Sequence, residues 1–374
     1  MQSIHFADNI ARLRKEKKIT QEQLADFVGV TKASVSKWET GQSLPDVVLL
    51  PQLAAYFDVT IDEMLGYEPW LSKEQIQKIY LELAKEFATE EFEKVMNKSR
   101  ELVKKYYSCY EFLSQIVCLW INHYMLPGGT RSMEILEDAE AVCDHILTNS
   151  KDIGLCSDVV SLKATIGLRM GKATEVIETL EEMCNPYRLE TQNVGILIGA
   201  YLQAGELEKA NSFTQISMYD YLVSLVGCAT QYISIHKDNL ALCEETFGRI
   251  HKVADAYELE KLNFNVMVLF YYQMAIIFCQ HEKKTEAIAL LKKFIYLTDA
   301  FLQGEEGPLK GDSYFDALDE WFNKLTLGQN APRDKKIIYD SMISVFATPA
   351  FAVLEAEDEY QKLKEFARKR GSNL

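Results

Sequence analysis

The hydrophobic positions of the chain follow the spacing of helices over most of its length. Near the N-terminus, Ile10 and Leu13 lie three positions apart in a stretch, residues 5–17, that we predict to be a helix with an inward apolar face. From residue 72 to about 302, the chain shows one predicted helix after another with short breaks. Proline, with 8 residues, and glycine, with 18, are scarce, which favours long helices over a turn-rich β fold. We therefore predict an all-α protein.

Two shorter helices follow the first one, and capping residues mark their ends. Thr20 stands directly before the second helix, and Gln23, three positions later, can complete a capping box with it. Gly29 can adopt the positive φ that commonly ends a helix, and it begins the turn into the third helix. We place this third helix between Thr31 and Gly41.

The third helix combines an apolar face with a polar one. Val35 and Trp38, at positions i and i+3, are expected to pack inward, and the small Ala25 of the second helix allows the two helices to cross closely. Small or polar side chains and two cations remain on the outer face. That combination suits the major groove of DNA, where hydroxyls and cations reach bases and phosphates. The outer residues are Lys32, Ala33, Ser36 and Lys37.

Residues 5–65 resemble the helix-turn-helix domain of the Cro and phage-repressor (XRE) family. The resemblance lies in the segments TQEQLA, VSKWE, GQSLP and LAAYFDVTIDEML and in the glycine turn. It implies a five-helix domain in which Gln21 contacts a DNA phosphate and Arg14 pairs with Glu39 for structural reasons. The alternative, a helical bundle without a DNA role, leaves the polar outer face unexplained. The resemblance implies base contacts from Lys32, Ala33, Ser34, Ser36 and Lys37, and we count Thr31, at the start of the third helix, among the DNA-binding residues.

The charge balance limits how strongly this module can bind DNA without regard to sequence. The chain has a formal net charge of −15, and residues 1–66 hold seven lysines and arginines against nine acidic residues. The basic residues are clustered and the acidic ones are spread, so a locally positive face remains. We therefore expect modest non-specific affinity and a marked dependence of binding on salt.

Composition and helix breakers divide the chain into four parts. We assign residues 1–66 to a DNA-binding domain and residues 67–71 to a linker, in which Pro69 breaks the preceding helix. Helical repeats are expected over residues 72–302, and a helical C-terminal cap over residues 303–374.

The repeat region resembles an array of tetratricopeptide repeats. Tyr201 and Ala210 fall where that repeat has an aromatic residue late in its first helix and a small residue early in its second. The predicted turns are 34 to 45 residues apart, and 34 residues is the period of that repeat. The resemblance implies a right-handed α-solenoid. We place the turns near Thr89, Thr130, Gly171, Gly205, Asn239 and Lys284.

Such solenoids have a concave face that commonly binds extended peptides or protein segments. Asparagine suits this role because one side chain can both donate a hydrogen bond to a peptide backbone and accept one from it. Each candidate can equally be an ordinary solvated polar position. The candidate peptide-binding residues are Asn193, Gln203, Asn263, Asn265 and Tyr271.

Several other classes of function have no signature in the chain. The eight cysteines form no C-x-x-C pair, so we expect reduced cysteines in a cytoplasmic protein. The N-terminus lacks the order of a signal peptide, and polar residues such as Asn265 interrupt the apolar run 264–280, so we expect no membrane span. No phosphate-binding loop, G-x-G-x-x-G or H-E-x-x-H motif occurs. We therefore expect no metal, no cofactor and no enzyme activity.

The combination of an XRE-type head and a tetratricopeptide-like body resembles the peptide-responsive quorum-sensing regulators of Gram-positive bacteria. The resemblance implies a cytoplasmic homodimer that binds double-stranded DNA and a short signalling peptide. Peptide binding would change the arrangement of the two DNA-binding heads. One alternative keeps the DNA-binding head but makes the body a platform for another protein. Another makes the body an enzyme or a small-molecule sensor.

Overall fold

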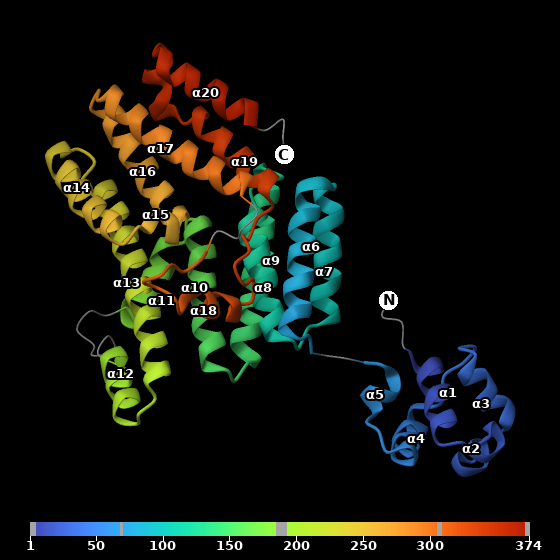
Figure 1. Ribbon diagram of the computed structural model, residues 1–374. Helices are drawn as coiled ribbons and strands as arrows, with labels where there is room; N and C mark the ends of the chain where they lie inside the picture. The colour runs from blue at the N-terminus through green and yellow to red at the C-terminus, as the bar shows by residue number, and fades with distance from the viewer. Residues whose placement is uncertain (1–4, 68–69, 185–192, 305–308, 371–374) are drawn as a thin grey trace. The chain divides into compact units, whose positions relative to one another are not determined.

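The computed structural model describes residues 5–67, 70–184, 193–304 and 309–370. Regular structure in these ranges is helical, apart from an isolated antiparallel bridge between Asn263 and Leu309. The all-α prediction is therefore confirmed. The predicted linker residue Pro69 lies outside the described residues. By internal contacts the chain divides into two compact units, residues 1–72 with 97–113 and residues 73–96 with 114–374, and each is described by itself below (Figure 1).

Five α-helices form the N-terminal domain, and their caps follow from the sequence. The Thr20 hydroxyl accepts a hydrogen bond from the Gln23 amide, and the Gln23 side chain accepts one from the Thr20 amide, so the predicted capping box is present. Gly29 ends the second helix with φ at +72°. The helices are α1 (Phe6–Glu16), α2 (Gln21–Val28), α3 (Lys32–Glu39), α4 (Leu50–Phe57) and α5 (Ile61–Leu65), with a 3₁₀ turn, η1 (Val47–Leu49), before α4.

The apolar faces of these helices meet in one small core. Val35 and Trp38 of α3 are buried there, as predicted, against Leu24 and Ala25 of α2. Because α3 packs on α2 through Val35 and Trp38, the opposite face of α3 is left exposed.

After residue 72 the chain continues as helices, and this run includes the stretch 97–113 that groups with the first unit. α9 packs on α10, α10 on α11, α12 on α13, α13 on α14, and α16 on both α13 and α17. The helices are α6 (Lys73–Thr89), α7 (Phe92–Lys105), α8 (Tyr110–His123), α9 (Gly129–Asn149), α10 (Ile153–Arg169), α11 (Ala173–Met183), α12 (Asn193–Gln203), α13 (Leu207–Ile235), α14 (Leu240–Ala256), α15 (Leu259–Leu262), α16 (Phe264–Gln280) and α17 (Lys284–Gln303).

Most of the six predicted turns lie at or next to the end of a helix, among them Thr89 at the end of α6 and Lys284 at the start of α17. Gly171, Gly205 and Asn239 lie in breaks between helices, whereas Thr130 lies in the first turn of α9. A small residue also allows α10 and α11 to approach closely, because a Cβ on Gly167 would lie 2.7 Å from the Val176 side chain. The region is therefore repeat-like, with short turns between packed helices.

The largest departure from a regular repeat is the length of α13. A 34-residue repeat would contain a break between Gly205 and Asn239, but α13 runs without interruption for 29 residues. No proline occurs in that stretch, and Gly227 lies within the helix with open space around it. Nothing in the local sequence therefore ends the helix early.

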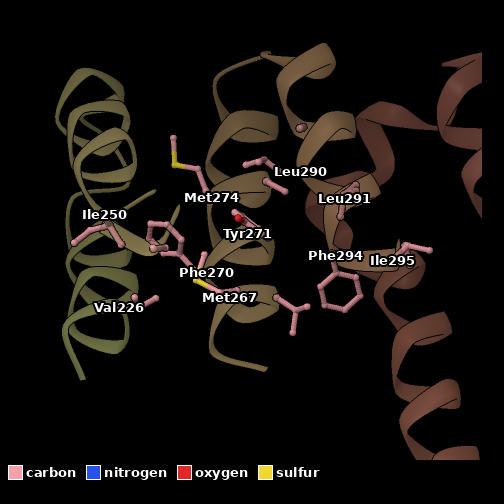
Figure 2. Close-up of a cluster of buried hydrophobic side chains, with 14 of the residues drawn as sticks. Val226, Ile250, Met267, Phe270, Tyr271, Met274, Leu290, Leu291, Phe294 and Ile295 are labelled. Carbon is pink, nitrogen blue, oxygen red and sulfur yellow. The ribbon is translucent and has the colours of Figure 1, made fainter. Parts of the chain in front are cut away.

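The C-terminal region completes the core of the helical repeats. Met267, Phe270 and Met274 of α16 lie in one buried cluster with Leu291 and Phe294 of α17 (Figure 2). Side chains from the C-terminal helices belong to the same cluster. These elements are α18 (Leu318–Lys324), α19 (Lys335–Ser344), η3 (Val345–Ala347), η4 (Pro349–Leu354) and α20 (Asp358–Arg370).

The segment between α17 and α19 runs back across other helices of the same unit. The Gln215 side chain of α13 donates to the Asp316 carboxylate over 2.7 Å and accepts from the Ala317 amide over 2.9 Å. Further along, the Tyr80 hydroxyl of α6 donates to the Pro332 carbonyl over 3.1 Å. These bonds fix a stretch that would otherwise have few backbone partners.

Candidate nucleic-acid interface and ligand cleft

The start of α3 is fixed by two hydroxyl groups. The Thr31 hydroxyl accepts from the Ser34 amide over 3.2 Å and lies 2.9 Å from the Ser34 hydroxyl. Thr31 therefore caps the helix. One hydroxyl hydrogen is used between the two side chains, so the other can be donated at the helix end where an anion is favoured.

The outer face of α3 is accessible and has two cations. Lys32, Ala33 and Lys37 are exposed, and Ser36 is half-buried. The Lys32 ammonium lies 3.8 Å from the Glu22 carboxylate, an exposed pair that contributes little to stability. Within the part of the chain that the structure describes, no ion pair or hydrogen bond engages the Lys37 ammonium. The side chains expected to meet DNA thus share one surface.

An ion pair behind this surface holds α1 against the end of α3. Arg14 donates two hydrogen bonds to Glu39, from Nε to Oε1 over 2.5 Å and from a terminal nitrogen to Oε2 over 3.0 Å. The side chains are only 14% and 9% exposed. The structure therefore brings together the two residues that the family resemblance pairs, in a bidentate geometry.

Gln21 joins the same cluster. Its side-chain nitrogen donates to Glu39 Oε2 over 2.9 Å. One amide hydrogen is thus used inside the protein, and one remains for the DNA phosphate that the resemblance assigns to this residue. Burial opposes ionisation of Glu39, but the hydrogen bonds from Arg14 and Gln21 outweigh it, so the pKa of Glu39 lies below its ordinary value.

Replacing Arg14 with alanine should lower the free energy of unfolding of the N-terminal domain by about 2–3 kcal/mol, because Glu39 would lose its cation while partly buried. The lowered pKa of Glu39 means that its contribution is present above the unfolded-state pKa and is lost as the pH falls through the folded-state pKa. Hydrogen exchange of α1–α3 amides in the full chain, followed by mass spectrometry at pH 7 and in mild acid, measures both effects.

Arg12 provides the matched control for this experiment. It also pairs with a glutamate, Glu16, but both side chains are more than half exposed. The Arg12→Ala variant should lose less than about 0.5 kcal/mol. Equal losses in the two variants would show that the Arg14–Glu39 pair has no special structural role.

A cleft in the second unit is the clearest candidate ligand site outside the N-terminal domain. It has a volume of about 540 Å³ and lies among α16, α17, α19 and the chain before α19. Its lining is mainly apolar with several amide side chains. The lining residues are Asn122, Asn263, Phe264, Asn265, Val268, Leu269, Tyr272, Phe294, Thr298, Phe301, Leu309, Asn330, Ala331, Pro332, Arg333, Ile338, Ser341, Met342 and Val345.

The structure places the five predicted peptide-binding residues in three different settings. Asn263 and Asn265 line the cleft. Asn193 and Gln203 are exposed at the two ends of α12 and do not line it. Tyr271 is fully buried, so the prediction that it lines an accessible groove is wrong. The cleft-facing side of α16 carries residues 265, 268, 269 and 272, and Tyr271 points to the core instead.

Buried Tyr271 is explained by polar partners inside the fold. Its hydroxyl donates to the Glu260 carboxylate and receives a hydrogen bond from Lys293 over 3.3 Å. Lys293 also pairs with Glu260 over 3.1 Å. Tyr271 therefore has a structural role, because its hydroxyl makes its hydrogen bonds inside the fold.

Sequence reasoning missed several residues of the cleft, among them Asn122, Asn330 and Arg333. These come from the end of α8 and from the segment before α19. No local pattern marks them, because only the packing of distant segments brings them to one place.

The described ranges show neither a metal centre nor a membrane helix. They contain no group of three or more His, Cys, Asp or Glu side chains that could hold a metal ion. Nor is any helix in them long and apolar enough to cross a membrane. The histidine of α8, His123, is buried, and burial lowers its pKa to about 4.

Known proteins resemble mainly the N-terminal domain. A helix-turn-helix family model matches residues 10–64. The transcriptional activator BcrR of Enterococcus faecalis is 35% identical over 83 residues, which are 21% of this chain and 41% of that protein. The regulator AnsR of Bacillus subtilis is 38% identical over 61 residues, 16% of this chain and 53% of that protein. The match spans about half the length of these relatives.

A shorter relative is covered more fully. The phage CTXphi transcriptional repressor RstR of Vibrio cholerae is 35% identical over 78 residues, which are 21% of this chain and 67% of that protein. Among solved structures, PlcR of Bacillus thuringiensis, in complex with the peptide PapR7 and DNA, aligns with 80% of this chain and 95% of its own, at 14% identity and a TM-score of 0.32.

Proposed function

The chain belongs to the helix-turn-helix family of transcription regulators, and from that premise we propose that it binds a specific DNA operator through α3. The observation that carries this proposal is the outer face of α3. It is exposed, it combines small side chains with Lys32 and Lys37, and its opposite face is fixed in the core by Val35 and Trp38. A rigid helix with a polar, accessible face is what the major groove admits.

The residues of this face have separate roles in the proposal. The Lys37 ammonium reaches a base edge or a phosphate, and Ser36 and Ala33 lie beside it against the groove floor. Thr31 and Ser34, at the positive end of α3, meet a phosphate or base at the groove edge. Gln21 uses its remaining amide hydrogen on a phosphate. Glu39 does not face DNA, since Arg14 and Gln21 occupy its carboxylate.

Replacing Lys37 with alanine should weaken operator binding by about 1–3 kcal/mol. Fluorescence anisotropy of the full chain on a selected operator, at several salt concentrations, measures the change. If Lys37 meets a base, the loss should be confined to the operator. If it meets a phosphate, binding to all duplexes should weaken and the salt dependence should become shallower.

Lys94→Ala is the control, since Lys94 is an exposed lysine of the helical-repeat region that pairs with Glu90. It should leave DNA affinity unchanged. Equal operator affinity of the Lys37→Ala variant and the parent would remove Lys37 from the interface.

We propose further that the helical-repeat region binds a short regulatory peptide and that the protein acts as a cytoplasmic homodimer without enzyme activity. Asn265, exposed at the cleft, supports the peptide part, because an amide side chain can bind a peptide backbone. In a dimer, a ligand that alters how the two heads are held changes operator affinity without touching a base contact.

Native mass spectrometry of protein purified from its own host tests the peptide and the dimer together. A dimer with a peptide-sized adduct that is lost on mild activation supports both. A dimer without an adduct, even after incubation with the low-molecular-weight fraction of spent medium, favours a repeat region that binds another protein. A monomer at micromolar concentration contradicts the dimer.

A further inference from the structure

The cleft described above contains a cation without an acidic partner. Arg333 lines it and is half-buried, yet within the described residues it makes no hydrogen bond or ion pair. No described residue of the lining is acidic, in a chain with 55 aspartates and glutamates. An unpaired, partly desolvated guanidinium is unfavourable unless something else supplies the negative charge.

The acidic residue next in the chain does not supply that charge. Asp334 caps α19, and its carboxylate accepts a hydrogen bond from the Lys336 amide over 2.9 Å. The two largest effects on the pKa of Arg333 are burial and then the positive charge of Arg169, and both lower it. A guanidinium stays protonated in proteins under such conditions. The cleft thus keeps a positive charge that no described residue balances.

The position of Arg333 is held by neighbouring contacts rather than by its own. The preceding carbonyl, of Pro332, accepts the hydrogen bond from Tyr80 on α6, and α19 begins at Lys335 directly after the cap. The backbone on both sides of Arg333 is therefore anchored. A side chain presented from an anchored backbone loses little further freedom when it binds a ligand.

The amide side chains of the cleft differ in their availability. Asn263 is occupied, since it donates to the Tyr219 hydroxyl over 2.9 Å and accepts from the Val266 amide over 3.2 Å. Asn265 is exposed, and no described residue forms a hydrogen bond with its side chain. Asn265 can therefore pair with a peptide backbone, whereas Asn263 shapes the start of α16.

The rest of the lining is suited to apolar side chains. Phe264, Val268 and Leu269 come from α16, and further apolar residues come from the facing helices. A volume of about 540 Å³ falls within the range of about 300–1,000 Å³ that small-ligand sites have. The cleft therefore has room for the end of a peptide rather than for a long extended chain.

We infer that this cleft binds the C-terminal end of a short apolar peptide, with the terminal carboxylate on Arg333 and the backbone on Asn265. This inference rests on the proposed peptide control and identifies where and how the ligand is recognised. A carboxylate matches one guanidinium in a bidentate pair. Arg333 is the one cation among the described lining residues, and a single arginine fits a carboxylate better than a phosphate. The same carboxylate chemistry could also come from an acidic side chain.

Affinity selection with defined peptides tests the inference on the full chain. Three pools of N-acetylated tetrapeptides built from Leu, Ile, Val, Phe and Gly are offered. The first pool ends in a free carboxylate, the second in a carboxamide, and the third in a carboxamide with one internal Asp or Glu. Mass spectrometry reads which members the protein retains. We expect at least tenfold greater retention of free acids than of carboxamides.

Substitutions at Arg333 test whether this residue causes the preference for free carboxylates. Arg333→Gln should bring the ratio of acids to carboxamides close to one, and Arg333→Lys should restore only part of it, because a lysine cannot form the bidentate pair. The Arg249→Gln control, which alters an exposed arginine paired with Glu245 on α14, should keep the parent ratio. Free Arg333→Gln protein should melt at the same temperature as the parent or higher, since an unbalanced charge is removed.

The possible results distinguish a failure of this inference from a failure of the proposed peptide control. Equal retention of acids and carboxamides by the parent would overturn the carboxylate site while leaving peptide control standing. Retention of the third pool alone would place an acidic side chain, not the terminus, on Arg333. Retention of no pool, together with the absence of a host peptide in native mass spectra, would overturn both. A parent-like ratio in a folded Arg333→Gln variant would exclude Arg333.

Discussion

Replacing Trp38 with alanine is expected to unfold most of the N-terminal domain and to abolish DNA binding. Trp38 is 4% exposed and belongs to the small core shared by α1–α5. Removing a buried aromatic side chain costs about 3–5 kcal/mol. A domain of this size has a total stability of only about 3–10 kcal/mol. The substitution should therefore remove much of the stability of the N-terminal domain.

Hydrogen exchange and DNA binding of the full chain measure this result together. Amides of α1–α5 should lose protection in the Trp38→Ala variant, while amides of α16 and α17 should keep it. Trp70, a tryptophan that is 62% exposed, supplies the control, and its alanine variant should change stability by less than about 0.5 kcal/mol. Full operator affinity in the Trp38→Ala variant would mean that α3 is not positioned by this core.

Replacing Phe270 with alanine should destabilise the helical-repeat region by about 3–5 kcal/mol. Phe270 is fully buried, stacks on Phe247 with ring centroids 5.0 Å apart, and lies in the cluster that α16 shares with α17 and the C-terminal helices. The neighbours come from several helices that cannot all move inward to fill the space. A cavity should therefore remain.

Leu269, one position earlier on the same helix, is the control because its side chain is 52% exposed. Leu269→Ala should cost less than about 1 kcal/mol. Chemical denaturation followed by far-ultraviolet circular dichroism separates the two variants. Similar midpoints for both would show that α16 faces the core differently from the arrangement described here.

The parts of the fold that the sequence predicts well depend on local chemistry. The Thr20–Gln23 capping box and the turn at Gly29 require residues only a few positions apart, and both are present. Val35 and Trp38 are buried as their spacing predicts. Such features depend on the backbone of one short segment, so no knowledge of the rest of the fold is needed.

The cleft depends on packing between distant segments and could not be predicted in the same way. Asn122 and Arg333 are more than two hundred positions apart, yet they line one site. Periodicity does not show whether Tyr271 faces inward, because α16 is apolar on nearly every side. The contacts of α16 with α13, α17 and η4 fix its orientation.

Selection of binding sites from random double-stranded DNA by the full chain shows whether α3 reads DNA. We predict enrichment of a defined sequence made of two half-sites about one helical turn or a multiple of it apart. We also predict that the Lys37→Ala variant enriches that sequence less. Enrichment of no sequence, or the same enrichment by parent and by a variant with Lys32, Ser36 and Lys37 all replaced by alanine, would contradict the claim that α3 reads DNA.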